Sequence, residues 1–180
     1  MSLRIIAGAF KKHKIKSPGN NRTHPMGERV RAAIFNKIVN WLPEAEVLDT
    51  FAGTGALGLE AISRGAAKAV LVEKDRIAQK VIAENIEALR AEDKAVLVRA
   101  RIQSWINTRT NDDKFDIIFA DPPYYDPQFH VIDKLPPLLK DDGVLILSHP
   151  THIETPVLPG ARLFDVRKYS GATVAYYYAD

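Results

Sequence analysis

Val47-Leu48-Asp49-Thr50-Phe51-Ala52-Gly53-Thr54-Gly55-Ala56-Leu57-Gly58-Leu59-Glu60 is the stretch that decides the fold. A short apolar run ends in Asp49, a turn with glycines at 53, 55 and 58 follows, and an apolar segment with helical spacing begins directly behind it. Glycine reaches positive φ at low cost and lets a ligand approach the backbone, and the first turn of the next helix has free N–H groups. The pattern predicts a strand, a glycine-rich turn and a helix that together bind a nucleotide-like ligand.

The acids near this turn bear on the choice of ligand. Asp49 would place a negative charge beside the pyrophosphate of a dinucleotide, whereas it would attract S-adenosylmethionine (SAM), which carries a sulfonium and an ammonium group. Glu73 ends the apolar run 69–72, where such folds direct a carboxylate to ribose hydroxyls. Glu73 suits SAM and NAD equally, so Asp49 alone favours SAM.

Composition limits the class of protein. The chain has 180 residues, of which 46% are hydrophobic, and this predicts one domain with a sizeable core. It contains no cysteine, which excludes disulfides and thiolate metal sites and favours a reducing, cytoplasmic location. We expect no membrane partner, because no apolar run has the length of a membrane span and residues 1–10 lack the layout of a signal peptide.

Charge is distributed unevenly along the chain. The formal net charge is +3, yet residues 1–40 contain nine Lys or Arg and one acid, Glu28, so this segment carries +8 and the remainder −5. A basic arm on a mildly acidic body is typical of nucleic-acid binders, because phosphate contacts supply most of the sequence-independent affinity. The alternative is a solvated basic terminus that assists solubility.

The first 40 residues divide into three predicted parts. Residues 4–8 and 14–16 resemble two short strands, so we expect a small basic β-hairpin. Residues 17–24 are rich in turn formers and predict a linker. From Glu28 the apolar residues have helical spacing, which places Arg29 and Arg31 on or beside a helix. We therefore expect an extension over residues 1–25 and a main domain over residues 26–180.

The rest of the chain alternates between strands and helices. Further strands are predicted at 69–73, 95–98, 115–121 and 143–147, and helices at 57–64 and 75–90. Continuous apolar strands that alternate with helices indicate an α/β fold with a parallel sheet covered on both faces. Segments 162–169 and 173–178 predict a closing antiparallel hairpin, in which the tyrosines at 176–178 serve packing.

A second motif, Asp121-Pro122-Pro123-Tyr124, follows the fourth predicted strand. Its chemistry suits methylation of an exocyclic amine on a planar base: the Asp121 carboxylate and a neighbouring carbonyl can accept the two N–H bonds, and Tyr124 can stack on the base. The prolines restrict the backbone and hold the acceptor and the ring in register. This alignment matters because the sulfonium of SAM is already activated.

The sequence resembles the RsmD family of 16S ribosomal RNA (guanine-N2)-methyltransferases over essentially its whole length, including both motifs. The matching stretches are Arg4-Ile5-Ile6-Ala7-Gly8, Arg29-Val30-Arg31-Ala32-Ala33-Ile34-Phe35-Asn36, residues 48–61, Ser63-Arg64-Gly65-Ala66, and Phe115-Asp116 with Asp121 to Tyr124. The basic start and the Arg-Val-Arg helix distinguish this family from other amino-methylating enzymes. The family commonly has Arg-Pro-Thr-Thr-Asp where this chain has His24-Pro25-Met26-Gly27-Glu28.

The resemblance implies a Rossmann-like class I SAM-methyltransferase with a seven-stranded, mostly parallel sheet. It implies a monomer that acts on 16S rRNA or on the small ribosomal subunit or its assembly intermediate. The expected cofactor residues are Asp49, Phe51, Ala52, Gly53, Gly55, Glu73, Lys74, Ile102, Gln103 and Asp121. The expected catalytic residues are Asp121, Pro122, Pro123 and Tyr124. The expected RNA-binding residues are Arg4, Lys11, Lys12, Lys14, Lys16, Arg22, Arg29 and Arg31.

Two other functions remain open from the residues. One is a DNA amino-methyltransferase of adenine N6 or cytosine N4, although only the basic arm is available as a target-recognition region. The other is a non-catalytic RNA-binding ribosome assembly factor that keeps SAM or NAD as a ligand. No metal site is expected, because His149 and His152 have no neighbouring carboxylate cluster in sequence, and the chain lacks a Gly-x-Ser-x-Gly nucleophile elbow.

Overall fold

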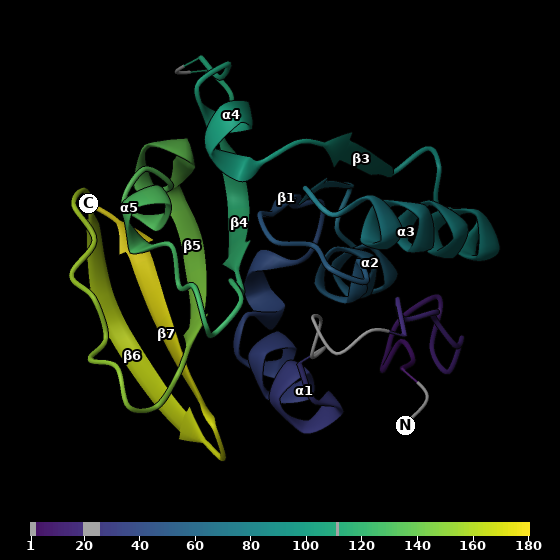
Figure 1. Cartoon of the computed structure of the whole chain (residues 1–180), viewed down its shortest axis with the longest axis horizontal. Coiled ribbons are helices and arrows are strands. Elements are labelled where there is room, and N and C mark those ends of the chain that lie inside the picture. The colour runs from purple at the N-terminus through teal and green to yellow at the C-terminus, as the bar shows by residue number, and fades with distance from the viewer. Residues whose placement is uncertain (1–2, 20–25, 111) are drawn as a thin grey trace.

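The computed structural model describes residues 3–19, 26–110 and 112–180, and its centre is a seven-stranded sheet (Figure 1). The strand order is β3-β2-β1-β4-β5-β7-β6, in which the first five are parallel and β7 runs antiparallel to both of its neighbours. The strands are β1 Glu46–Asp49, β2 Lys68–Glu73, β3 Ala95–Arg99, β4 Phe115–Ala120, β5 Leu139–His149, β6 Ala161–Tyr169 and β7 Ala172–Ala179. The predicted sheet and its C-terminal hairpin are confirmed.

Alternation along the strands builds two cores, one on each face of the sheet. In β1, Val47 belongs to one cluster and Leu48 to the other, and in β4 the same is true of Ile117 and Ile118. Successive side chains of a strand point to opposite faces, so a strand that is apolar throughout needs cover on both. Helices supply that cover on both faces.

The helices segregate into two layers around the sheet. Helices α1 (Glu28–Lys37), α2 (Ala56–Ser63) and α3 (Arg76–Leu89) pack into the first core, and α4 (Ile102–Ile106) and α5 (Phe129–Ile132) pack into the second. Single 3₁₀ turns lie at η1 (Val39–Trp41) and η2 (Pro136–Leu138). Pro136 and Pro137 cannot continue an α-helix, so only a 3₁₀ turn forms between α5 and β5. None of the described helices is long and apolar enough to cross a membrane.

The basic arm packs onto α2 and α3 (Figure 1). The predicted hairpin is reduced to one antiparallel bridge, between Arg4 and Lys14, and two short loops. Ile5 and Ile15 are buried in the first core, so the described part of the arm is anchored by apolar contacts. The carboxylate of Glu60, on α2, accepts hydrogen bonds from the amides of Ile6 (2.7 Å) and Ala7 (3.0 Å).

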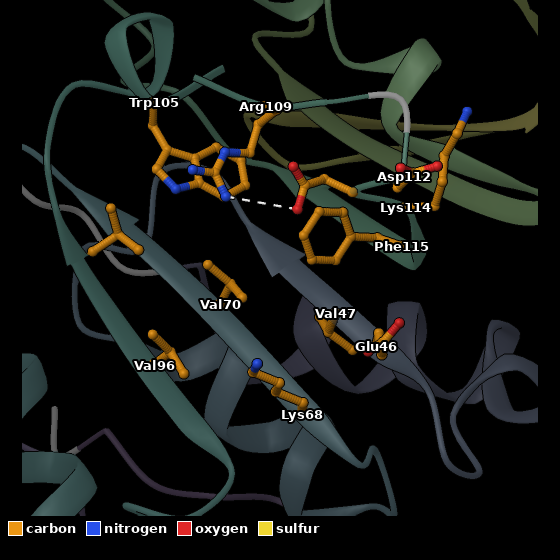
Figure 2. A pocket seen from close by; sticks show the side chains of 12 residues that line it. Glu46, Val47, Lys68, Val70, Val96, Trp105, Arg109, Asp112, Lys114 and Phe115 are labelled. Carbon is orange, nitrogen blue, oxygen red and sulfur yellow. Dashed lines mark ion pairs between the residues drawn. The ribbon is translucent and has the colours of Figure 1, made fainter. Parts of the chain in front are cut away.

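Helix α4 is short and leaves a hollow of about 290 Å³ over the starts of β1, β2 and β4 (Figure 2). Its floor is formed by valines of the sheet, and Trp105 lies at its edge with the Arg109 guanidinium 4.6 Å from the ring centroid. The hollow contains no residue of the glycine turn or of the Asp-Pro-Pro-Tyr motif. It lies at the opposite end of the strands from the cavity described below.

Replacing Glu60 should loosen the arm. Glu60 has no exposed surface, and Glu60→Ala would leave two arm amides and the Arg64 guanidinium without their acceptor. Removing one partner of a buried charged network costs about 3–5 kcal/mol, so we expect a loss of that order in the free energy of unfolding. Urea denaturation measures this. The matched control is Glu84→Ala, which removes the exposed partner of Lys16 and should leave the midpoint unchanged.

Candidate active site

A cavity of about 820 Å³ opens at the carboxyl ends of the parallel strands. It lies where the strand order reverses, between β1 and β4, which is the usual ligand crevice of a doubly wound sheet. The turn after β1 and the residues that follow β2, β3 and β4 form its wall, together with the start of α1 and the β6–β7 turn. Both sequence motifs therefore face one cavity.

Glu73 holds the glycine-rich turn in shape. Its Oε2 accepts a hydrogen bond from the Gly53 amide at 2.8 Å, and its Oε1 accepts one from the Asp75 amide at 2.7 Å. Gly53 and Gly55 have φ of 56° and 79°, in the left-handed region that favours glycine. The carboxylate thus fixes the turn, and its remaining lone pairs face the cavity where a ribose would lie.

Asp49 lies behind the turn and does not line the cavity. It is 1% exposed, and its Oδ2 accepts a hydrogen bond from the Gly58 amide in the first turn of α2 at 3.1 Å. Its Oδ1 has no hydrogen-bond partner among the described residues. Burial raises the pKa of Asp49 to about 7; the Gly58 bond opposes the rise, and Asp121 and Glu73 add to it.

Gly55 also stays out of the cavity wall. A Cβ at this position would lie 3.2 Å from Leu71 Cδ2 and 3.3 Å from Leu59 Cδ1, and its positive φ would strain any other residue. Gly55 therefore serves the close packing of α2 on the sheet.

The Asp-Pro-Pro-Tyr motif carries an ordered polar chain. The Tyr124 hydroxyl lies 2.7 Å from Ser148 Oγ, at the end of β5. Burial raises the pKa of Asp121 to about 6, and a hydrogen bond with the Ser148 side chain opposes that rise. If Tyr124 donates to Ser148 and Ser148 donates to one oxygen of Asp121, the other carboxylate oxygen stays available as an acceptor. The ring of Tyr124 is then held beside the carboxylate.

Most residues expected at the site line the cavity. They are Phe51, Ala52, Gly53, Glu73, Lys74, Ile102, Gln103, Asp121, Pro122, Pro123 and Tyr124. Met26, Val30, Gln128 and the segment 170–172 also line it and were not predicted from the sequence. Gln128 has a left-handed φ of 49° and a buried side-chain nitrogen without a partner among the described residues. No sequence pattern marks Gln128 as a cavity residue, because it lies several positions after the end of β4. The β6–β7 turn is distant in sequence from both motifs and could not be predicted either.

The cations expected to contact RNA differ in exposure. Arg4, Lys11, Lys12, Lys14, Lys16 and Arg29 are exposed. Arg4 pairs with Glu28 at 2.9 Å and Lys16 with Glu84 at 2.8 Å. Arg31 is only 1% exposed and lies in the cavity wall, which changes the expectation that it contacts RNA at the surface. Arg22 lies outside the described residues.

The charges of the cavity fit SAM. Its wall carries three acids, Glu73, Asp75 and Asp121, and three cations, Arg31, Lys74 and Arg101. This mixture of signs suits a zwitterionic ligand such as SAM, which has a sulfonium, an ammonium and a carboxylate, better than a pyrophosphate, which is only negative. The described residues contain no group of three or more His, Cys, Asp or Glu placed to hold a metal ion. The fold and the site together define a class I SAM-dependent methyltransferase.

The chain belongs to the family described as "Conserved hypothetical protein 95", whose model matches residues 3–178. It is 34% identical over 158 residues to Ribosomal RNA small subunit methyltransferase D of Escherichia coli K12, covering 88% of this chain and 77% of the relative. It is 29% identical to the Haemophilus influenzae protein of the same name, covering 85% and 78%. The resemblance to the RsmD family is thereby confirmed.

Solved structures agree over the full length of the chain. The proposed methyltransferase yhhF from Escherichia coli superposes with a TM-score of 0.87 at 28% identity, covering 100% of this chain and 99% of that one. A hypothetical protein from Thermus thermophilus gives a TM-score of 0.84 at 29% identity, covering 97% and 98%. These likenesses include the arm as well as the sheet.

Ionisation of Asp49 should make stability fall as the pH rises. Its pKa of about 7 in the folded protein lies above about 3.9 in the unfolded chain, so the folded protein binds more protons between these values. The free energy of unfolding should therefore increase as the pH falls from 8 to 6, by up to about 1.4 kcal/mol per unit for this group. Asp49→Asn can still accept from Gly58, and we expect it to flatten this slope and to be more stable than the wild type at pH 8.

Urea denaturation at pH 6, 7 and 8 measures the slope, and Asp126→Asn on the exposed loop after Tyr124 is the matched control. A slope that is the same in Asp49→Asn and in the wild type would show that Asp49 does not ionise in this range.

Proposed function

We propose that this protein transfers a methyl group from SAM to the exocyclic N2 amine of one guanine in small-subunit ribosomal RNA. We further propose that it works as a monomer in the cytoplasm and that residues 1–25 form an RNA-binding extension. The observation that carries the proposal is the shared cavity: Asp121 to Tyr124 and the glycine turn face one space, in a chain of the RsmD family. Relatives named as small-subunit rRNA methyltransferases support the substrate.

The Asp-Pro-Pro-Tyr motif would position the guanine. The N2 lone pair is delocalised into the ring, so it needs an acceptor that draws its N–H bonds into one orientation. The Asp121 carboxylate provides that acceptor in its ionised form, and a backbone carbonyl beside it accepts the second N–H bond. Tyr124 would stack on the base, and its bond to Ser148 keeps the ring from turning away. Alignment of the nitrogen with the methyl group then lowers the barrier.

The glycine turn and the neighbouring strand ends would hold SAM. SAM supplies a methyl group whose bond to sulfur breaks as the bond to nitrogen forms, leaving a neutral thioether and an amine that loses one proton. Gly53 and its neighbours Phe51 and Ala52 would contact the methionine part, and Glu73 with Lys74 the ribose. Ile102 and Gln103, at the start of α4, would lie against the adenine.

The decisive experiment offers tritiated SAM with naked rRNA, small-subunit particles and DNA, followed by nucleoside analysis of the product. We expect N2-methylguanosine in rRNA. Label in N6-methyladenine or N4-methylcytosine of DNA would make the protein a DNA amino-methyltransferase. S-adenosylhomocysteine should raise the melting temperature by mass action whereas NAD should not. Binding of S-adenosylhomocysteine without any labelled product would indicate the assembly factor.

Asp121→Ala should lower methyl transfer by orders of magnitude, because the carboxylate acts chiefly in the transition state. The dissociation constant of S-adenosylhomocysteine, measured by calorimetry, should change little. Asp126→Ala, a little further along the chain, is the control and should turn over like the wild type. Near-normal turnover of Asp121→Ala would remove Asp121 from the mechanism.

The exposed lysines of the arm should act on RNA affinity through charge alone. Lys11, Lys12 and Lys14 make no ion pair among the described residues, whereas Arg4 and Lys16 do. Replacing the three lysines with Gln should flatten the log–log salt dependence of RNA binding by about 0.7–0.9 for each phosphate that is no longer neutralised. Filter binding at several salt concentrations measures the slope. An unchanged slope would mean that the arm serves solubility only.

A further inference from the structure

We propose that the guanidinium of Arg31 binds the carboxylate of the methionine part of SAM. The inference deepens the proposed function and rests on it, since it assigns one residue to one group of the cofactor. Arg31 lies in the first half of α1, well before the glycine turn in sequence, and lines the same cavity as Thr54, Ala56 and Leu57.

Arg31 is a buried cation with unused donors. Its side chain is 1% exposed, and its Nη2 donates to the backbone oxygen of Arg4. Its Nε and Nη1 have no hydrogen-bond partner among the described residues. Burial lowers the pKa of Arg31, yet a guanidinium remains charged in proteins. A buried charge with two unpaired donors is costly, and an anion in the cavity would remove that cost.

The acids near Arg31 are bound to other groups. Glu60 Oε1 accepts from the Ala7 amide and from Arg64 Nε at 2.7 Å, and its Oε2 accepts from the Ile6 amide. Glu28 is held by the Arg4 guanidinium through three hydrogen bonds. Both acids act on Arg31 only at longer range. The missing partner of Arg31 is therefore an anion that arrives from the cavity.

The position of Arg31 selects the carboxylate among the groups of SAM. The other cations in the cavity wall, Lys74 and Arg101, follow β2 and β3, where the ribose and adenine would lie. Arg31 lines the cavity from α1 instead, and Ala56 and Leu57, the first two residues of α2, line the same cavity. The first intrahelical bond of α2 runs from the Leu59 amide to the Gly55 carbonyl, so the amides of Ala56 and Leu57 have no intrahelical acceptor and are open to a ligand in the space between them and Arg31. A carboxylate there would have a guanidinium and the positive end of a helix on either side.

Burial also argues against a phosphate of the RNA backbone as the partner. A phosphodiester is flanked by two nucleosides and binds at an accessible surface, whereas the Arg31 side chain is 1% exposed and is bound to the backbone of the arm at Arg4. The exposed Arg29, two residues earlier, is the better placed of the two for RNA.

The test compares SAM with decarboxylated SAM, which retains the sulfonium, ribose and adenine and lacks only the carboxylate. Calorimetry gives the ratio of the two dissociation constants for the full-length protein. In the wild type the ratio should favour SAM, and Arg31→Met should shift it by roughly ten- to a hundred-fold towards decarboxylated SAM, as expected for losing hydrogen bonds to a charged group. Arg31→Lys should restore part of the preference.

Two further variants separate the proposed role from a structural one. Arg64→Met removes a guanidinium of the same cluster that does not line the cavity, and it should keep the wild-type ratio. Arg31→Gln keeps an uncharged side chain with two N–H donors in place of the guanidinium, so it should remain folded and lose the preference even if Arg31→Met melts early. If Arg31→Gln is folded and its ratio of dissociation constants for SAM and decarboxylated SAM equals that of the wild type, the proposal is wrong. If in addition the variant binds RNA more weakly, the partner of Arg31 is an RNA phosphate. A wild type that binds neither ligand would overturn the SAM site itself.

Discussion

The glycine-rich turn between β1 and α2 lies where the strand order reverses, and the hydrogen bonds of two carboxylates fix its backbone. The carboxylate of Glu73, at the end of β2, accepts from the Gly53 amide, and the carboxylate of Asp49, at the end of β1, accepts from the Gly58 amide. Each acid accepts from a backbone group that the turn would otherwise leave unsatisfied. The main role of Asp49 and Glu73 in the structure is therefore to stabilise the backbone of the turn.

The arm and the cofactor turn belong to one hydrogen-bonded network. Asn85 of α3 is 1% exposed; its Oδ1 accepts from the Lys16 amide at 2.7 Å, and its Nδ2 donates to the carbonyls of Lys16 and Thr54. Together with Glu60, it joins the arm to α2 and to the turn. The segment proposed to bind RNA is thus packed against α2, α3 and the turn that shape the cavity. Removing it whole would disturb both, whereas changing its exposed lysines would not.

Sequence reasoning succeeded where a local pattern and the fold agree. The strands of the parallel sheet could be predicted because buried strands are continuously apolar, and the two motifs could be placed because strand ends meet at one edge of such a sheet. It was less successful where tertiary contacts decide. Ser148 lies next to Asp121 only because β5 pairs with β4, and the β6–β7 turn reaches the cavity only through the closing hairpin. Residues 4–8 and 14–16 predicted two short strands, yet Ile5 and Ile15 are buried in the first core and the two segments share a single bridge.

Arg29 and Arg31 show that the sequence alone does not reveal the role of a basic residue, because the role depends on whether the side chain is exposed or buried. Arg29 and Arg31 are two positions apart on α1, so they lie on different sides of the helix and meet different surroundings. Arg29 faces solvent, where a cation costs little and can attract a phosphate chain. Arg31 faces the core, where a cation persists only if an anion or acceptors satisfy it. Since the acids around Arg31 already bind the arm and Arg64, the cavity is the direction from which its partner must come. The two roles proposed for this helix therefore fall on opposite faces, RNA contact on the exposed face with Arg29 and cofactor binding on the buried face with Arg31.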